Sequence, residues 1–166
     1  MSYVLATQRL ALAPVAARDH AVLLAHWTEP QVRRFLFDGM ILSAADVARA
    51  IEDSARSFEE AGYGLWLIRE RDGGGLAGTA GLRPLEDLGL EVIYSLAPCV
   101  WGKGYATEAA RAVVDYALGS MGLPEVLAEI DTGNRASAAV AERLGMVPFA
   151  EVDGLLGPMT RYRTTR

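Results

Sequence analysis

Apolar and polar residues along this chain repeat with the period of a helix in five segments. The clearest is residues 104–119, where small and aliphatic side chains recur at steps of three and four residues: Ala106, Ala109, Ala110, Val113, Val114, Ala117 and Leu118. Helical patterns also occupy residues 19–27, 31–37, 43–62 and 135–144. Ser43 is a typical N-cap residue and Gly62 a typical C-terminal stop, so the sequence predicts a long helix between them.

The segments between these helices have the alternation of strands. They are 4–14, 63–70, 76–82, 90–97 and 126–131, with two more strands expected near Pro148 and at 159–164. The turn Asp72-Gly73-Gly74-Gly75 predicts an antiparallel hairpin, and the short connection 84–89 predicts a second one. The sum is one mixed α/β (α+β) domain over residues 1–166, with a mostly antiparallel central sheet of six to seven strands flanked by helices.

Composition excludes several classes of protein. The chain has 166 residues, a formal net charge of −5, one Cys and two His. The lone Cys99 rules out an intrachain disulfide, and together these residues are too few for a structural zinc site. The negative charge argues against nucleic-acid binding, and no apolar run approaches the roughly 20 residues that span a bilayer. No secretory leader is recognised at the N-terminus, so we expect a cytoplasmic protein without metal, nucleic acid or membrane partners.

A glycine-bearing turn separates the predicted strand 90–97 from the predicted helix 104–119. The first N–H groups of a helix have no intrahelical acceptor, and that end carries a partial positive charge. Gly102 and Gly104 lack a Cβ, so an anion can approach the backbone closely, and Lys103 adds a cation. The arrangement is typical of a diphosphate site, although two glycines also occur in plain turns.

Two well-known phosphate motifs fail at this turn. The P-loop requires Gly where Ala97 stands and Ser or Thr where Gly104 stands. The dinucleotide fingerprint requires Gly or Ala in place of Thr107, and it normally lies in the first strand-to-helix turn of its fold. The anion that fits this turn is therefore identified neither by a P-loop nor by a dinucleotide motif.

The segment Trp101-Gly102-Lys103-Gly104-Tyr105-Ala106-Thr107-Glu108-Ala109 resembles the acyl-CoA diphosphate loop of the GCN5-related N-acetyltransferases (GNAT). Gly104 and Ala106 fill the two small-residue positions of that loop. Trp101 stands where Gln or Arg is commoner in the superfamily. Trp followed by Gly-Lys-Gly-Tyr-Ala-Thr-Glu instead resembles the sequence of the RimJ/RimL-like branch of the superfamily. This branch comprises the ribosomal-protein alanine N-acetyltransferase-like proteins.

Three further blocks resemble that branch and follow in the expected order. They are Thr7-Gln8-Arg9-Leu10, Gly78-Thr79-Ala80-Gly81-Leu82, and Asn134-Arg135-Ala136-Ser137 with the later Leu144-Gly145-Met146. Met146 replaces the usual Phe and keeps an apolar side chain. The likeness therefore extends over nearly the whole chain.

The resemblance implies that acetyl-CoA, as co-substrate, lies in a cleft where two parallel strands, 90–97 and 126–131, splay apart. The amides from Gly102 to Thr107 would hold the diphosphate, and the backbone of the strand end would pair with the pantetheine arm. The cofactor-binding residues so implied are Leu96, Ala97, Trp101, Gly102, Lys103, Gly104, Tyr105, Ala106, Thr107, Asn134 and Ser137. An amide at the strand end could also polarise the thioester carbonyl.

Two catalytic residues follow from the same resemblance. Glu91, on the strand beside the cofactor, is the candidate base that deprotonates the acceptor ammonium, directly or through a water. The alternative is that Glu91 only makes a cross-strand pair. No Tyr follows Gly145, so Ser137 is the candidate proton donor to the leaving thiolate. Its alternative is a helix-surface hydroxyl bonded to its own backbone, with solvent as the acid.

Several other polar and aromatic residues have simpler interpretations. Glu108 is explained by the helix dipole alone. Trp27, Phe35, Phe37 and Trp66 are expected to be core residues or walls of a substrate pocket. His20 and His26 have the wrong spacing for a metal pair and are expected to be surface or partly buried residues, and Cys99 is expected to be a small apolar filler.

The leading hypothesis is an acetyl-CoA-dependent N-acetyltransferase whose acceptor is a primary amine, either a protein N-terminus or a small amine. The acceptor side would come from the first two helices, the loop 37–42 and the C-terminal strands. The alternatives are a non-catalytic acyl-CoA-binding sensor on the same fold and a nucleotide-dependent reductase. The oligomeric state is not readable, although homodimers are common among relatives.

Overall fold

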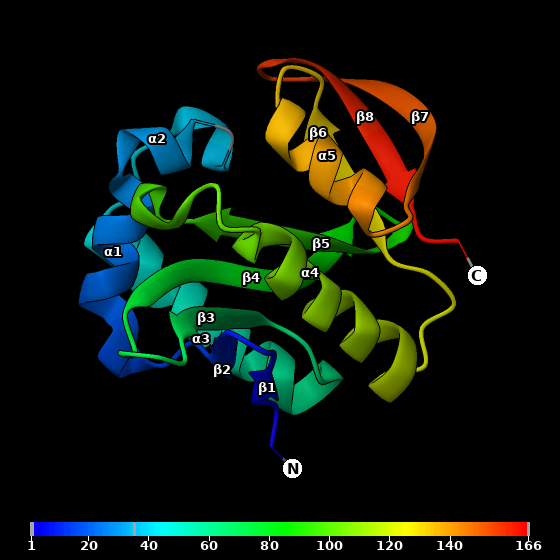
Figure 1. The fold of residues 1–166 in the computed structure, drawn as a ribbon. Helices are drawn as coiled ribbons and strands as arrows, with labels where there is room; N and C mark the ends of the chain where they lie inside the picture. Colours follow the sequence, from blue (N-terminus) through cyan, green and yellow to red (C-terminus); the bar gives the residue numbers. More distant parts are fainter. Residues whose placement is uncertain (1, 35, 166) are drawn as a thin grey trace.

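In the computed structural model, which describes residues 2–34 and 36–165, eight strands form one sheet in the order β1-β2-β3-β4-β5-β6-β8-β7 (Figure 1). The strands are β1 (Leu5–Ala6), β2 (Leu10–Pro14), β3 (Leu65–Glu70), β4 (Leu76–Leu85), β5 (Gly89–Leu96), β6 (Leu127–Asp131), β7 (Val147–Gly154) and β8 (Gly157–Arg163). Within the described residues β5 and β6 are parallel and the other neighbouring strands are antiparallel. Both hairpins predicted from the turn sequences are confirmed.

The sheet has one strand more than the upper end of the predicted range. The predicted strand 4–14 divides into β1 and β2, which pair with each other through Leu5 and Leu12. The division follows from a turn at Thr7, whose N–H donates to the carbonyl of Leu10 at 2.9 Å. A hairpin thus replaces one long strand.

The helices are α1 (His20–Thr28), α2 (Pro30–Arg33), α3 (Ala44–Ala61), α4 (Tyr105–Asp115) and α5 (Arg135–Arg143), with short 3-10 helices η1 (Ala17–Asp19), η2 (Phe37–Gly39) and η3 (Pro98–Val100). The predicted caps of α3 are confirmed: Ser43 accepts from the Asp46 N–H, and Gly62 takes a left-handed φ of +79°. The predicted helix 104–119 is confirmed as α4 followed by the π-helical turn η4 (Tyr116–Ser120).

The predicted helix 31–37 is wrong in its second half. The helix α2 ends at Arg33, and Leu36 is extended. Phe37, Asp38 and Gly39 then take φ values of +57°, +52° and +78°, a left-handed conformation that cannot continue an α-helix. Phe35 lies outside the described residues.

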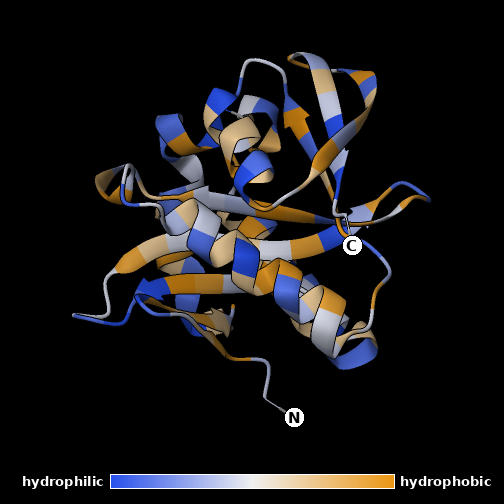
Figure 2. Ribbon diagram, turned by 45° about the vertical axis from the view of Figure 1, so that its right-hand side comes forward, coloured by the Kyte–Doolittle hydropathy of each residue, from blue (hydrophilic) through white to orange (hydrophobic). Residues whose placement is uncertain are grey.

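Two buried apolar clusters hold the helices on the sheet. On one face, α4 packs its small and aliphatic residues against the central strands, in a cluster that includes Val92, Leu96, Ala109 and Val113. On the other face, α1 and α3 enclose a smaller cluster: Val15, Leu23, Trp27, Val47, Ile51 and Leu67. Figure 2 shows α4 crossing the sheet with hydrophobic and hydrophilic residues alternating along its length, as expected for a helix with one buried face. Trp27 and Trp66 are buried, as predicted.

Candidate active site

The candidate site begins where β5 and β6 part. The two parallel strands share one register pair, Glu91 with Leu127. On the other side β5 stays paired with β4 along its whole length, and the N–H of Ala97 donates to Ala77 at 2.7 Å. Because alternate residues of a strand turn their N–H groups to opposite neighbours, Leu96 directs its N–H toward β6. No strand among the described residues pairs with β5 on that side beyond Glu91. The end of β5 therefore presents an unpaired edge.

The backbone of Leu96 and Ala97 is less available than the resemblance implied. Ala97 uses both backbone groups: its N–H in the sheet and its carbonyl as acceptor for the Val100 N–H at 3.0 Å. The carbonyl of Leu96 accepts from the indole Nε1 of Trp101 at 2.8 Å, although that indole is half exposed. The backbone of Ala97 is therefore bonded within the sheet and the turn, and its role toward the cofactor stays a prediction. The N–H of Leu96 is the strand-end amide that faces the opening.

The turn before α4 has the geometry predicted for anion binding. Gly102 and Gly104 take φ values of +82° and +80°, which L-residues other than glycine rarely adopt. The first bond of the helix runs from the Glu108 N–H to the Gly104 carbonyl at 3.1 Å. The N–H groups of Tyr105, Ala106 and Thr107 precede that bond and have no intrahelical acceptor. The buried hydroxyl of Thr107 also lacks a partner among the described residues. The turn therefore fits a diphosphate.

Glu108 does more than favour the helix dipole. Its carboxylate accepts from the Thr7 hydroxyl at 2.7 Å and from the Arg9 guanidinium at 2.7 Å. Burial raises the pKa of Glu108, but the hydrogen bonds from Thr7 and Arg9 outweigh it and lower the pKa. Arg9 also donates to the carbonyl of Lys103 at 2.8 Å. The N-terminal hairpin thus fixes the turn and the first turn of α4 together.

Lys103 and Tyr105 are tied to the end of β3. The Tyr105 hydroxyl donates to Glu70 at 2.8 Å, and the Lys103 ammonium lies 3.8 Å from the same carboxylate. The ring of Tyr105 is buried against the core and is covered by Arg9, whose guanidinium lies 4.7 Å from its centroid. The side chain of Tyr105 therefore anchors the helix. What Tyr105 offers to a ligand is its N–H.

Asn134 and Ser137 lie at the start of α5, across the opening from β5 (Figure 1). Asn134 caps the helix, since its Oδ1 accepts from the Ser137 N–H at 3.2 Å. The Ser137 hydroxyl makes no hydrogen bond with the described residues. Tyr94, on β5, donates its hydroxyl to the Ser137 carbonyl at 3.4 Å, and burial raises the pKa of Tyr94 to about 12.

Tyr94 is the site residue that sequence reasoning missed. Strand alternation puts its side chain with Val92 and Leu96, on the face of β5 opposite Glu91. The sequence alone assigns Tyr94 no role. The available signal was the position of Tyr94 two residues before Leu96, on the strand that the resemblance places beside the cofactor.

Glu91 lies deep in the same strand, only 3% exposed. The Arg83 guanidinium of β4 donates to its Oε1 at 2.7 Å, so the cross-strand pair considered from the sequence exists. Burial raises the pKa of Glu91, against the opposing effect of Arg83. A buried carboxylate with a raised pKa is a stronger base than an exposed one. The pair with Arg83 and a role as base are compatible.

Two expectations about residues near the site need correction. His26 is buried rather than exposed or partly buried, and its Nε2 lies 2.8 Å from the Ser95 hydroxyl, which in turn lies 2.8 Å from that of Thr79. Burial lowers the pKa of His26. Cys99 is exposed, so it fills no core space. Among the described residues no group of His, Cys, Asp and Glu is arranged to hold a metal ion.

No helix in the described part of the chain is long and apolar enough to cross a bilayer.

Comparison with known proteins agrees with this geometry. The acetyltransferase (GNAT) domain family matches residues 9–147. The Bacillus subtilis (strain 168) protein YkkB is 32% identical over 146 residues, 86% of this chain and 84% of YkkB. A solved acetyltransferase from Agrobacterium tumefaciens str. C58 has a TM-score of 0.85 at 25% identity, covering 100% of this chain and 96% of its own. RimL, a ribosomal L7/L12 alpha-N-protein acetyltransferase solved with coenzyme A, has a TM-score of 0.83 at 13% identity over 96% of both chains.

The chain therefore belongs to the GNAT acetyltransferase family, and it is an acyltransferase. The GNAT fold uses acetyl-CoA as its co-substrate. The family assignment sets aside the reductase that shared only the glycine turn.

Proposed function

We propose that this protein transfers the acetyl group of acetyl-CoA to a primary amine by direct attack of the neutral amine on the thioester. The observation that carries the proposal is the divergence of β5 from β6 after Glu91. It leaves an open strand edge between the amides of the α4 turn on one side and the start of α5 on the other. Bound acetyl-CoA would supply the thioester at this edge.

The residues at the opening fit that molecule in three places. The N–H groups from Gly102 to Thr107, with the unpartnered Thr107 hydroxyl, would hold the diphosphate. The N–H of Leu96 would donate to the thioester carbonyl and stabilise the negative charge that develops on it. The side-chain nitrogen of Asn134 would donate to the pantetheine arm. Lys103 and Trp101 would flank the diphosphate turn from partly exposed positions.

Two proton transfers accompany the exchange of bonds. The new bond joins the amine nitrogen to the acyl carbon, and the bond between that carbon and sulfur breaks. Glu91 would take the proton that the ammonium must lose, through a water, because its carboxylate is too buried to touch a bulky acceptor. The Ser137 hydroxyl would give its proton to the sulfur and regain one from solvent. Tyr94 would hold the Ser137 turn in place.

A second candidate function is binding of acyl-CoA without catalysis. The observation in its favour is the ion pair of Glu91 with Arg83, which engages the only base assigned on β5. Both functions use the same cofactor-binding turn. They differ in whether the thioester of the bound acyl-CoA is cleaved by an amine or stays intact.

The test is amine-dependent release of free thiol from acetyl-CoA by the purified protein, measured against a panel of primary amines. Catalysis predicts release that saturates with both substrates and yields one acetylated amine per thiol. A rise in melting temperature with acetyl-CoA, without thiol release for any amine, would establish the sensor and refute the proposal.

A further inference from the structure

A cavity of about 290 Å³ lies on the face of the sheet that carries Glu91. It is partly open to solvent and is lined by residues of α1, α3, the turn η2, β4 and β5. Ile93 of β5 lines it, two residues along the strand from Glu91, and Arg83 lines it next to the same carboxylate. Tyr94 is also one of its lining residues, although strand alternation turns its ring to the opposite face of the sheet. The cavity therefore adjoins the residues assigned to the reaction.

The walls of the cavity are mainly apolar and aromatic. Trp27, Phe37 and Tyr63 contribute rings, and the rings of Trp27 and Phe37 meet edge to face with centroids 5.4 Å apart. Ala50 and Ile93 close it from the helix and the strand. Chambers of this kind hold ligands mainly by their hydrophobic part.

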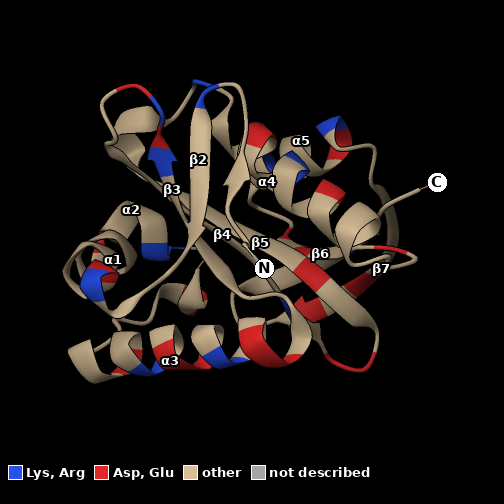
Figure 3. Ribbon diagram, turned by 90° about the horizontal axis from the view of Figure 1, so that it is seen from below, with Lys and Arg blue, Asp and Glu red and all other residues tan. Residues whose placement is uncertain are grey.

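The two charged side chains that line the cavity both have partners. Asp53 is exposed on α3 and lies 3.3 Å from Arg56, on a helix where Figure 3 shows acidic and basic residues interspersed. Arg83 is bound to Glu91. A ligand with a charged or strongly polar tail would lose part of its hydration in the chamber without gaining a matching charge. The chamber therefore favours an apolar body.

A carboxylate without a full set of partners lies on the same face of the sheet. Glu91 and Leu127 are register partners, and Glu129 and Asp131 alternate with Leu127 along β6, so both carboxylates lie on the face of the sheet that carries Glu91 and Ile93. Asp131 is the last residue of β6 and is only 7% exposed, and its Oδ1 has no hydrogen-bond partner among the described residues. Because Oδ1 of a carboxylate accepts hydrogen bonds, the partner that Asp131 lacks is a hydrogen-bond donor.

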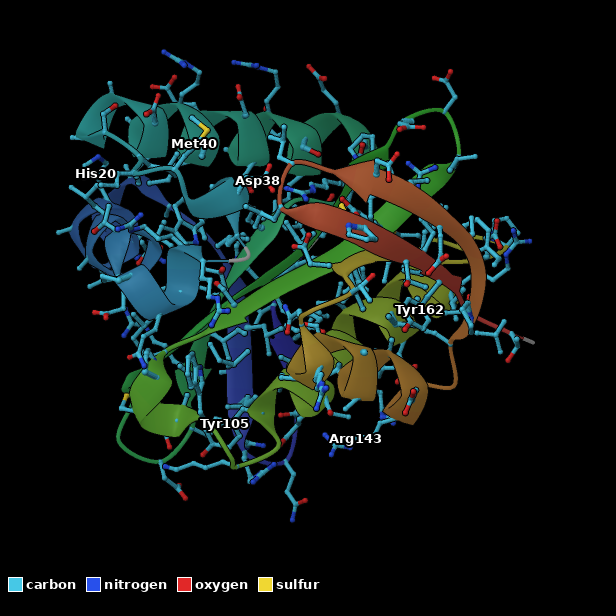
Figure 4. All side chains as sticks on the ribbon, turned by 90° about the horizontal axis from the view of Figure 1, so that it is seen from above. His20, Asp38, Met40, Tyr105, Arg143 and Tyr162 are labelled. Atoms are coloured by element: carbon cyan, nitrogen blue, oxygen red, sulfur yellow. The ribbon has the colours of Figure 1, made fainter. Side chains whose placement is uncertain are left out.

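The turn η2 joins the two features. Phe37 forms part of the apolar wall, and burial, together with the negative charges of Asp38 and Glu129, raises the pKa of Asp131. Figure 4 shows Asp38 on the side of the molecule where the turn between β7 and β8 also lies. One cation placed between these carboxylates would relieve their repulsion and satisfy the buried oxygen of Asp131.

We propose that the acceptor is a primary monoamine with an aromatic or branched aliphatic body, held with the body in this chamber and the ammonium toward Asp131. This inference rests on the proposed function and names its substrate class. A volume of about 290 Å³ equals the share of roughly ten water molecules in the liquid, so the body and its arm have about ten non-hydrogen atoms. An arylalkylamine such as 2-phenylethylamine matches both size and chemistry. Polyamines and peptide N-termini carry further charges or amide groups that the chamber does not pair.

The test compares kcat/KM for 2-phenylethylamine, spermidine and an alanine-terminated peptide at a fixed saturating concentration of acetyl-CoA. The inference predicts a value at least tenfold higher for 2-phenylethylamine than for the other two. Preference for spermidine or the peptide would overturn the inference and leave the proposed transfer intact. Transfer to none of the amines, with acetyl-CoA still raising the melting temperature, would instead refute the proposed function.

Variants of α3 test the chamber directly. Ala50→Phe and Ser57→Phe place a ring inside the cavity, whereas Ala55→Phe places the same ring on the exposed face of the helix. Each filling variant should lower kcat/KM for 2-phenylethylamine at least tenfold, while Ala55→Phe stays within twofold and all three keep the acetyl-CoA-induced shift in melting temperature. Wild-type kcat/KM in either filling variant would contradict the inference. Asp131→Asn should raise KM for the amine at least fivefold, with a smaller change in kcat. An unchanged KM would exclude Asp131 as the residue that binds the ammonium group of the acceptor.

Discussion

The hydroxyl of Tyr94 donates to the carbonyl of Ser137 at 3.4 Å, which links β5 to the first turn of α5 across the opening between β5 and β6. This bond spans the two elements between which the pantetheine arm and the thioester are proposed to lie. Tyr94 is a positioning residue, because its role is to hold the α5 turn rather than to exchange protons.

Tyr94→Phe removes that bond and should leave the reaction chemistry unchanged. We expect a loss of stability of about 0.5–1.5 kcal/mol, typical for one hydrogen bond, and a severalfold higher KM for acetyl-CoA. With a pKa of about 12, Tyr94 keeps its proton through pH 10, so the rate profile between pH 6 and 10 should have the same shape in wild type and variant. Tyr162→Phe is the control. A new or lost inflection in the Tyr94→Phe profile would assign Tyr94 a proton-transfer role instead.

Glu91→Gln tests the proposed base. Because burial raises the pKa of Glu91, a larger fraction of its carboxylate is protonated as the pH falls toward that pKa, above its ordinary value of 4.5. We expect kcat/KM to fall on the acid side in wild type, and the variant to lose that limb together with a factor of roughly 10²–10⁴ in kcat. Glu86→Gln, at an exposed carboxylate, should match wild type. Activity of Glu91→Gln within twofold of wild type would exclude Glu91 as the base.

Gly104→Ala tests the turn before α4. A left-handed φ of +80° costs an L-residue roughly 1–2 kcal/mol, which corresponds to a decrease of about 2–8 °C in melting temperature for a chain of this size. The variant should also lose most of the stabilisation that acetyl-CoA gives. Gly119→Ala, where the backbone has no left-handed φ, should do neither. An undiminished acetyl-CoA shift in Gly104→Ala would contradict diphosphate binding at this turn.

Arg9→Ala removes the link between the N-terminal hairpin and the α4 turn. Arg9 binds Glu108 and the Lys103 carbonyl but is itself partly exposed, so solvent screens the interaction. We expect KM for acetyl-CoA to rise roughly three- to tenfold, the equivalent of about 1 kcal/mol, with kcat within twofold. Arg56→Ala, at an exposed pair on α3, is the control. A decrease in kcat with unchanged KM would show that Arg9 acts in some other way.

His26→Gln tests the buried network with Ser95 and Thr79. Because burial lowers the pKa of His26 in the folded state, the unfolded chain takes up the proton first as the pH falls. The stability that His26 contributes is present above its ordinary pKa of 6.5 and is lost as the pH falls through the lowered folded pKa. The melting temperature of wild type should therefore fall between pH 7.5 and pH 5 more than that of His26→Gln. His20→Gln should keep the wild-type slope, and equal slopes in wild type and His26→Gln would disprove the assignment.

The sequence predicted the elements whose signals are local. The capped helix from Ser43 to Gly62, both glycine-joined hairpins and the helix after Gly104 depend on turn chemistry and periodicity that each segment carries itself. The left-handed conformation of Gly104 was not predicted, although glycine is the residue that adopts it most readily.

What the sequence left out depends on contacts between distant segments. His26 is buried because Ser95, far along the chain, supplies a hydrogen-bond partner. Glu108 gains its role from Thr7 and Arg9. The end of α2 before Phe37 reflects three consecutive left-handed residues, of which one alone is glycine. Tertiary packing, rather than local propensity, fixes each of these.

The most direct measurement is mass spectrometry of the acceptor after incubation of the protein, an arylalkylamine and acetyl-CoA labelled with ¹³C in its acetyl group. Transfer at the diverging ends of β5 and β6 predicts an amine that gains one labelled acetyl group for each free thiol, with loss of that product in Glu91→Gln. Release of free thiol together with labelled acetate, with the amine unmodified across the panel, would contradict the account.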